Sequence, residues 1–174
     1  IAQLLAHKEI CICAGAGGVG KTTTSASIAL GMAARGRKVA VLTIDPARRL
    51  ASSLGLEALS NEPTKVPPKK FTQAGLKPKG ELHALMLDTK STFDDLVVAN
   101  ASSREQGERI LANRFYRNIS GALSGTQEYM AMEKLYELHE RTDFDLVVVD
   151  TPPTRNALDF IDAPRRLSRF LDHR

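Results

Sequence analysis

The sequence predicts an α/β domain with a mainly parallel sheet between helices, and three observations support this class. Apolar, strand-like runs alternate with helical stretches along the chain. The runs at 38–44 and 144–149 have apolar centres without polar interruption, which is typical of central parallel strands covered on both faces. A glycine-rich turn at 15–20 joins the first strand to the first long helix.

The predicted elements follow one another with short connections and one long loop. Strands are predicted at 8–14, 38–44, 82–87 and 144–149. Helices are predicted at 21–35, 47–60, 89–100, 103–112, 115–123, 126–141 and, in short pieces, 157–172. Gly36 is well placed to end the first long helix in a left-handed turn. We find no internal repeat, and the order indicates one domain over 1–174.

The composition is that of an ordinary globular protein. The chain is 43% hydrophobic and 25% charged, and its 174 residues suffice for one compact domain. No apolar run approaches the roughly 20 residues that cross a bilayer, and no segment has the pattern of a signal peptide. We therefore expect a cytoplasmic protein, with peripheral attachment to a membrane as an alternative. Because residue 1 is isoleucine, we also expect a piece of a longer protein.

The positive charge is concentrated in one stretch. Residues 61–80 contain five lysines against one glutamate, and the chain as a whole has a net charge of +4. Its prolines and glycines predict a mobile basic loop. A solvated loop is favoured, and contact with an acidic partner or a membrane surface stays open. Nucleic acid is not expected as a partner, because no aromatic side chains are interleaved with the lysines.

Cys11 and Cys13 lie two residues apart on the first predicted strand, so both should point to one face. With no further cysteine in the chain, the pair does not support a structural zinc site. Small buried hydrophobic side chains are the favoured interpretation, and a role with a soft metal or metalloid is the alternative.

The strongest functional signal is a phosphate-binding loop between the first strand and the following helix. Residues 15–22 match the pattern G-x-x-x-x-G-K-[ST] in the strand–turn–helix setting that it requires. Its glycines let amide groups point inward toward an anion, while Lys21 supplies a positive charge and Thr22 a hydroxyl for Mg²⁺. The predicted ATP-binding residues are Gly15, Gly17, Gly18, Val19, Gly20, Lys21, Thr22 and Thr23.

Two aspartates follow the most apolar strands and should reach the same crevice. Asp150 ends the strand at 144–149 and is predicted to hold Mg²⁺ together with Thr22. Asp45 follows the strand at 38–44 and is predicted to orient the water that attacks the γ-phosphate. An alternative for Asp45 is a capping role at the next helix. The predicted catalytic residues are thus Asp45 and Lys21.

Three motifs in this order resemble a known family. The motifs are Gly-Gly-Val-Gly-Lys-Thr-Thr-Thr at 17–24, Leu-Thr-Ile-Asp-Pro-Ala at 42–47 and Asp-Thr-Pro-Pro-Thr at 150–154. They resemble the arsenical-pump, anion-transporting ATPases and their tail-anchored-protein-targeting relatives, within the deviant P-loop superfamily. The resemblance covers nearly the whole chain, as the N-terminal half of the family's nucleotide domain.

The resemblance implies roles for these residues. Asp45 would lie in the first switch and activate water, Asp150 would hold Mg²⁺, and 151–156 would form the second switch. Two subunits would close face to face over ATP, so a homodimer is implied for the complete protein. The implied function is Mg-dependent ATP hydrolysis coupled to a conformational switch, as in an arsenite efflux pump. The alternative is a nucleotide-gated module that binds a client, such as a tail-anchored membrane protein.

The chain departs from the family pattern at several positions. The family usually has a second lysine where Ala16 stands, and a His-Asn pair where Arg48 and Arg49 stand. Arg155 is a further basic residue in the second switch, and an arginine could replace the missing lysine. No Cys-x-x-Cys pair is present for the zinc ion between subunits of the targeting members.

Overall fold

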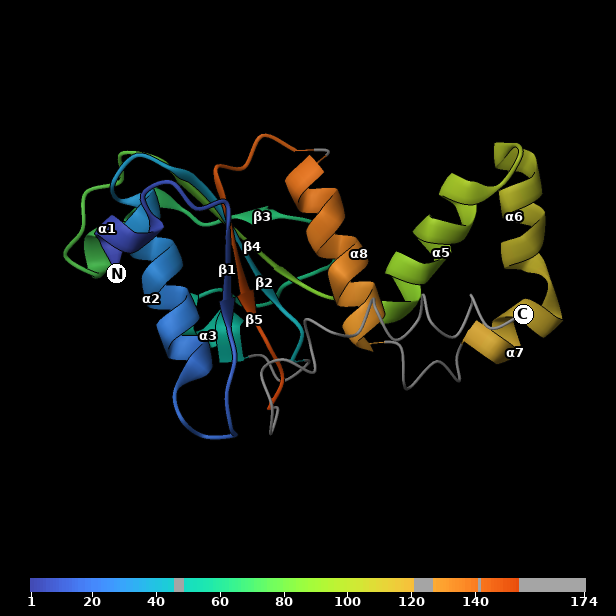
Figure 1. The fold of residues 1–174 in the computed structure, drawn as a ribbon, viewed down its shortest axis with the longest axis horizontal. Helices are drawn as coiled ribbons and strands as arrows, with labels where there is room; N and C mark the ends of the chain where they lie inside the picture. The colour runs from blue at the N-terminus through green and yellow to red at the C-terminus, as the bar shows by residue number, and fades with distance from the viewer. Residues whose placement is uncertain (46–48, 121–126, 141, 154–174) are drawn as a thin grey trace.

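A computed structural model describes residues 1–45, 49–120, 127–140 and 142–153. Within these residues the strands form one sheet with helices on both faces (Figure 1). The strands are β1 (Ile10–Cys13), β2 (Lys38–Thr43), β3 (Thr64–Lys65), β4 (Glu81–Met86) and β5 (Leu146–Asp150). Their order across the sheet is β1-β5-β2-β4-β3, and all described pairs are parallel except β3 with β4. The predicted fold class is confirmed.

The helices agree with the predicted ones in most places. They are α1 (Ala2–Leu5), α2 (Lys21–Ala33), α3 (Arg49–Leu54), α4 (Pro68–Gln73), α5 (Thr89–Asn100), α6 (Arg104–Ala112), α7 (Arg114–Ser120) and α8 (Gln127–Glu140). Helix α3 is shorter than predicted because the chain turns at Gly55, which has a φ of 65°. The predicted helices at 157–172 lie outside the described residues.

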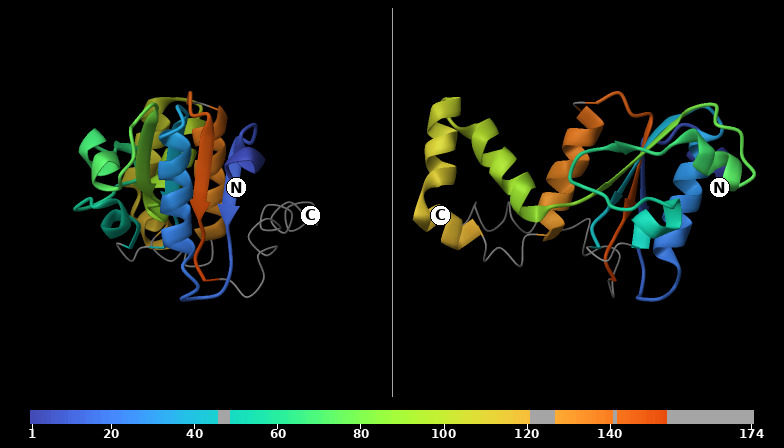
Figure 2. Two further views of the ribbon diagram at one scale, coloured as in Figure 1. Left: turned by 90° about the vertical axis from the view of Figure 1, so that its left-hand side faces the viewer. Right: turned by 180° about the vertical axis from the view of Figure 1, so that it is seen from behind.

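The two faces of the sheet bury separate apolar cores. Val39, Val41 and Val148 face a core with α2, α3 and α4, while Leu42 and Val149 face a core with α8. Figure 2 shows α2 against one face of the sheet and α8 against the other. Helix α2 packs closely because its sheet-facing side is built from small residues, with Ala29 and Ala33 fully buried. This close packing fixes the start of α2 at the carboxyl ends of the strands.

The prediction of one long loop at 61–80 is wrong. This stretch contains β3, which pairs with β4, and helix α4. Pro68 occupies the first turn of α4, where its missing N–H costs no hydrogen bond. Val66 and Phe71 are 2% and 1% exposed, so apolar burial anchors a segment whose prolines and lysines indicated a loop.

Helices α5, α6 and α7 extend away from the sheet beyond α8 (Figures 1 and 2). Gly107 of α6 permits a close crossing with α5, because a Cβ at this position would lie 3.2 Å from Val98. Phe93 stacks on Tyr116 with ring centroids 6.0 Å apart. None of the described helices is long and apolar enough to span a membrane.

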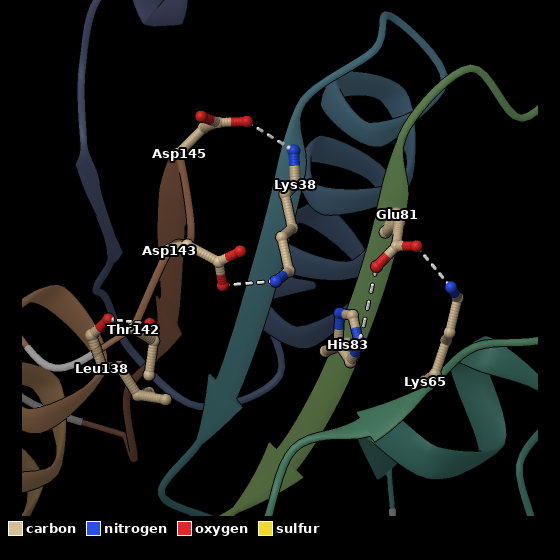
Figure 3. Close-up of polar contacts among 8 residues, drawn as sticks. All are labelled: Lys38, Lys65, Glu81, His83, Leu138, Thr142, Asp143 and Asp145. Atoms are coloured by element: carbon tan, nitrogen blue, oxygen red, sulfur yellow. Dashed lines mark hydrogen bonds and ion pairs between the residues drawn. The ribbon is translucent and has the colours of Figure 1, made fainter.

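Polar contacts join the amino ends of the central strands (Figure 3). Lys38 pairs with Asp143, its amide donates to Asp145, and Lys65 pairs with Glu81. His83 Nε2 lies 3.9 Å from Glu81, and the His83 ring packs edge-on against Phe144. We call Lys38, Lys65, Glu81, His83, Asp143 and Asp145 the amino-end cluster.

Candidate functional site

The glycine-rich turn leads directly from β1 into α2. Gly18 and Gly20 have φ angles of 78° and 87°, a region that other residues adopt only with strain, and Gly20 immediately precedes the helix. The amide groups of 17–20 donate no hydrogen bond to another group in the described part of the chain. These residues are exposed. The turn therefore presents amides to solvent beside a helix start, as an anion site requires.

Lys21 lies beside this turn with its ammonium group directed back over it. Its Nζ donates to the carbonyl oxygen of Ala16 at 2.9 Å. The side chain of Thr23 is exposed and that of Thr22 is half-buried. Gly18, Gly20, Lys21, Thr22 and Thr23 line one open cleft, so the structure brings this part of the predicted ATP-binding set together.

The parallel register brings the second aspartate to the same edge of the sheet. Asp150 of β5 is aligned with Cys13 of β1 on one side and with Thr43 of β2 on the other. Asp45 follows β2 by two residues, where Ile44 donates its amide to the Asp150 carbonyl at 3.1 Å. Both predicted aspartates therefore lie at the carboxyl ends of neighbouring strands, next to the glycine-rich turn.

The Asp150 carboxylate is buried but only partly satisfied. Thr43 donates to its Oδ2 at 3.1 Å, whereas Oδ1 is buried with no hydrogen-bond partner within the described residues. Burial raises the pKa of this carboxyl, while Thr22, Thr43 and the charge of Lys21 act in the opposite direction. A buried carboxylate oxygen without a partner fits a position that would face a cation.

The cleft between the turn and α3 has a volume of about 760 Å³. Its walls combine the residues of the turn with side chains from the end of β2, from α3 and from the segment after β5. The residues beyond the turn are Asp45, Arg49, Ser52, Ser53, Thr151 and Pro153. Asp45 Oδ2 lies 3.4 Å from an Arg49 guanidinium nitrogen, and the two side chains are 19% and 66% exposed.

Sequence reasoning missed several residues of this site. Thr43 donates a hydrogen bond to the Asp150 carboxylate. The sequence indicates it by a polar residue in an otherwise apolar run. Thr151 belongs to the predicted second switch, but its contact with β1 was not predicted: it donates both its amide and its hydroxyl to the Cys13 carbonyl, at 3.2 and 2.9 Å. Ser52 and Ser53 carry no sequence pattern that indicates a site. Arg48, Arg155 and 154–156 lie outside the described residues.

Cys11 and Cys13 are half-buried and pack against the same core as α2, as their spacing predicts. A hydrogen bond between the two thiols lowers the pKa of Cys13 to about 6 and, together with burial, raises the pKa of Cys11. Within the described ranges, no group of three or more His, Cys, Asp or Glu side chains could hold a metal ion.

Comparison with known proteins finds one family model and several similar ATPases. Residues 8–174 match the family model described as "Anion-transporting ATPase". The chain is similar to the protein named ATPase GET3 in Candida glabrata, with 31% identity over 95% of this chain and 48% of that protein. It is similar to ATPase GET3 of Malassezia globosa, with 29% identity over 91% of this chain and 43% of that protein. It is also similar to ATPase asna-1 of Caenorhabditis elegans, with 29% identity over 89% and 45%. The chain thus spans less than half the length of these relatives.

Proposed function

This chain belongs to the anion-transporting ATPase family, and from that membership and the cleft we propose that it binds Mg·ATP and hydrolyses it to ADP and phosphate. The single observation that carries the proposal is the cleft at the carboxyl ends of β2 and β5. There Gly18 and Gly20 of the exposed turn, the ammonium of Lys21 and the Asp45 carboxylate line one space, and Asp150 ends the neighbouring strand β5. Amides and an ammonium suit a triphosphate, and the carboxylates suit its cation and the attacking water.

Each residue has a defined part in this proposal. The turn holds the β- and γ-phosphates, and Lys21 moves from the Ala16 carbonyl to a phosphate oxygen. Asp45 accepts a hydrogen bond from the water and aligns it with the γ-phosphate for in-line attack. Asp45 suits this part because it lines the cleft and is only 19% exposed.

The residues present fit a magnesium ion. Thr22 and Asp150 supply oxygen ligands, which Mg²⁺ prefers, and one buried oxygen of Asp150 has no hydrogen-bond partner among the residues that the structure describes. Few protein ligands are needed, because Mg²⁺ keeps several waters and takes others from the phosphates. When bound, the ion would neutralise charge on the β- and γ-phosphates.

A conformational switch is supported by one contact between the cleft and the opposite face of the sheet. Gln127, the first residue of α8, donates from Nε2 to the carbonyl oxygen of Ile44 at 2.9 Å. Ile44 immediately precedes Asp45, so a shift of Asp45 on nucleotide binding would be transmitted to α8. Helix α5 packs against α8 and continues into α6 and α7, where Phe115 is 73% exposed.

Within the family, we favour the client-binding alternative over the arsenite pump. The relatives reported above bear the names ATPase GET3 and ATPase asna-1, and the GET3 name belongs to the tail-anchored-protein-targeting branch. A homodimer of the complete protein, closing over ATP, remains part of the proposal. Turnover stimulated by arsenite or antimonite would favour the pump. Nucleotide-dependent capture of an apolar helix, without that stimulation, would favour client targeting.

Two lysine variants, one in the cleft and one outside it, test the central proposal. Lys21→Ala should abolish binding of a fluorescent ATP analogue and release of phosphate from Mg·ATP. Lys69→Ala removes an exposed lysine of α4 outside the cleft and should leave both unchanged. Near-normal turnover of Lys21→Ala, with a folded protein by circular dichroism, would refute the assignment of this cleft.

A further inference from the structure

Two loops pack together at the amino ends of β2 and β4, on the side of the sheet opposite the nucleotide cleft. A Cβ at Gly80, just before β4, would lie 2.2 Å from the Arg37 carbonyl oxygen, so only glycine permits this approach. A Cβ at Gly36 would lie 4.0 Å from Lys79. In Figure 1 these loops lie at the upper left and the glycine-rich turn at the bottom. The loop after α2 and the loop before β4 therefore present their side chains on one surface.

Basic side chains without an acidic partner gather on this surface. None of them forms an ion pair with another described residue. Arg37 donates to the backbone carbonyl of Leu5 at 2.8 Å, and the same carbonyl accepts the amide of Lys8, which brings the end of α1 to the loops. We call this group the basic surface, and its members are Lys8, Arg35, Arg37, Lys77 and Lys79. All except the half-buried Arg37 are exposed.

The acidic side chains near the basic surface are already engaged elsewhere. Asp143 and Glu81 pair with lysines of the amino-end cluster. Glu9 Oε2 lies 2.9 Å from His139 Nε2, and Asp145 accepts the amide at the start of β2 at 2.7 Å. Cations that lie close together without a partner repel one another, and an anionic surface placed against them relieves that repulsion.

Exposed apolar side chains border the basic surface on α1. Ile1 and Leu4 are 78% and 72% exposed, and their spacing of three residues places them on one face of the helix. Ile1 lines a cleft together with Arg35, so this apolar face adjoins the cations. The boundary of a lipid bilayer accepts both kinds of side chain, because lipid phosphates contact the cations and the acyl region receives the apolar groups. A nucleic acid or an acidic polypeptide needs only the cations.

We propose that the basic surface, with Leu4 beside it, docks this chain on a membrane that contains anionic phospholipids. The lysines and arginines contact the lipid phosphates, and Leu4 enters the edge of the acyl region. The nucleotide cleft lies at the opposite ends of the strands, so it stays open to ATP while the protein is docked. This inference goes beyond the proposed ATP hydrolysis and does not depend on it.

Sedimentation with lipid vesicles tests the docking. The chain should bind vesicles of phosphatidylcholine and phosphatidylglycerol in equal parts, and it should not bind vesicles of phosphatidylcholine alone. Lys77→Gln combined with Lys79→Gln should weaken binding roughly 20- to 30-fold, since each basic residue near an anionic bilayer contributes about fivefold. The matched control, Arg109→Gln combined with Arg114→Gln, removes two exposed arginines of α6 and α7 and should bind as the parent chain does.

Leu4→Gln separates a membrane from other polyanions. It should weaken binding to the anionic vesicles roughly tenfold, the effect of burying most of a leucine side chain, and leave binding to polyglutamate and to duplex DNA unchanged. Full vesicle binding by the double lysine variant or by Leu4→Gln would overturn the proposal. Tighter binding of the parent chain to polyglutamate or DNA than to the vesicles would also overturn it, and would indicate an acidic partner instead.

Phosphate release from Mg·ATP, measured on the same samples, keeps this inference apart from the proposed function. The double lysine variant and Leu4→Gln should keep the turnover of the parent chain, because their side chains lie outside the nucleotide cleft. Lys21→Ala should lose turnover and still bind the anionic vesicles. A failure of docking and a failure of the ATPase assignment therefore give different results.

Discussion

Strand β5 has carboxylates at both ends, and the two ends are in opposite situations. Before its amino end, Asp143 is 81% exposed and pairs with Lys38 (Figure 3). At its carboxyl end, Asp150 is 1% exposed, and its Oδ1 has no partner among the described residues. The pKa of Asp143 is lowered by its hydrogen bond to Lys38, whereas the pKa of Asp150 is raised by burial.

This difference separates groups that pair within the fold from a group with a proposed functional role. The charged side chains Lys38, Lys65, Glu81 and Asp143 pair with one another and are partly or largely exposed, so each pair contributes little to folding. At the carboxyl end, a charge is buried without full compensation, which costs folding energy and leaves the group ready for an incoming cation. The same residue type thus has a structural role at one end of the strand and a proposed functional role at the other.

The largest effect should come from Asp150→Asn. Turnover of Mg·ATP should fall at least about 100-fold, or about 2.7 kcal/mol in the barrier, because a neutral amide holds Mg²⁺ poorly. The free energy of unfolding without nucleotide should not fall, since the variant removes a charge that burial disfavours. Phosphate release and urea denaturation measure the two quantities. A less stable protein with normal turnover would reverse the roles assigned to the two ends.

Thr43→Val sharpens the comparison, because it removes the hydrogen bond to Asp150 Oδ2 while keeping the shape of the side chain. We expect the Mg²⁺ concentration for half-maximal turnover to rise about tenfold, since groups that orient a metal ligand have effects of this size. Thr92→Val is the matched control: Thr92 is 2% exposed on α5 and bonds Asn61 at 3.3 Å. It should reduce stability by about 1 kcal/mol and leave the Mg²⁺ dependence unchanged.

The hydrogen bond between Thr43 and Asp150 is a feature of the site that the sequence could not predict. The glycine-rich turn could be predicted because its residues are contiguous and each has a local reason. The contact between β2 and β5 depends on strand register across more than a hundred residues, which no local pattern specifies. The two faces of β2 could not be assigned either, because Val41 and Leu42 are both apolar and both buried.

The prediction of a loop at 61–80 failed for a different reason. Prolines, glycines and lysines are usual in loops, and by composition they outweighed the two apolar residues that decide the structure. Val66 and Phe71 are buried only because the core beside α2 has room for them, which is a tertiary fact. Asp45 and Asp150, by contrast, were predicted from strand ends, and the structure brings both beside the turn.

A smaller effect is expected at the amino end of the same strand. Asp143→Asn should lower the free energy of unfolding only slightly, because the pair with Lys38 is largely exposed. The difference from the unchanged protein should shrink further in 1 M salt, which screens exposed charges. Turnover should be unchanged. Urea denaturation at two salt concentrations measures this, and a large loss of stability that salt does not reduce would show that the amino-end cluster is not a weak surface network.

The smallest effect should be a change in pH dependence caused by His83. Its ring is largely covered, and its Nδ1 is buried without a hydrogen-bond partner in the described part of the chain. Burial lowers the pKa of His83, and the charges of Lys38 and Lys65 act in the same direction, against Glu81 and Asp143. The unfolded chain, with an ordinary histidine pKa near 6.5, therefore binds the proton more readily than the folded chain.

It follows that this residue lowers stability as the pH falls through about 6.5 and contributes no penalty above it. His83→Phe keeps an aromatic ring against Phe144 and removes the titration. The free energy of unfolding of this variant should fall less between pH 7.5 and 5.5 than that of the parent chain, in urea titrations at each pH. A steeper fall would mean that the protonated ring is stabilised by Glu81, and that the amino-end cluster holds His83 as a charged partner.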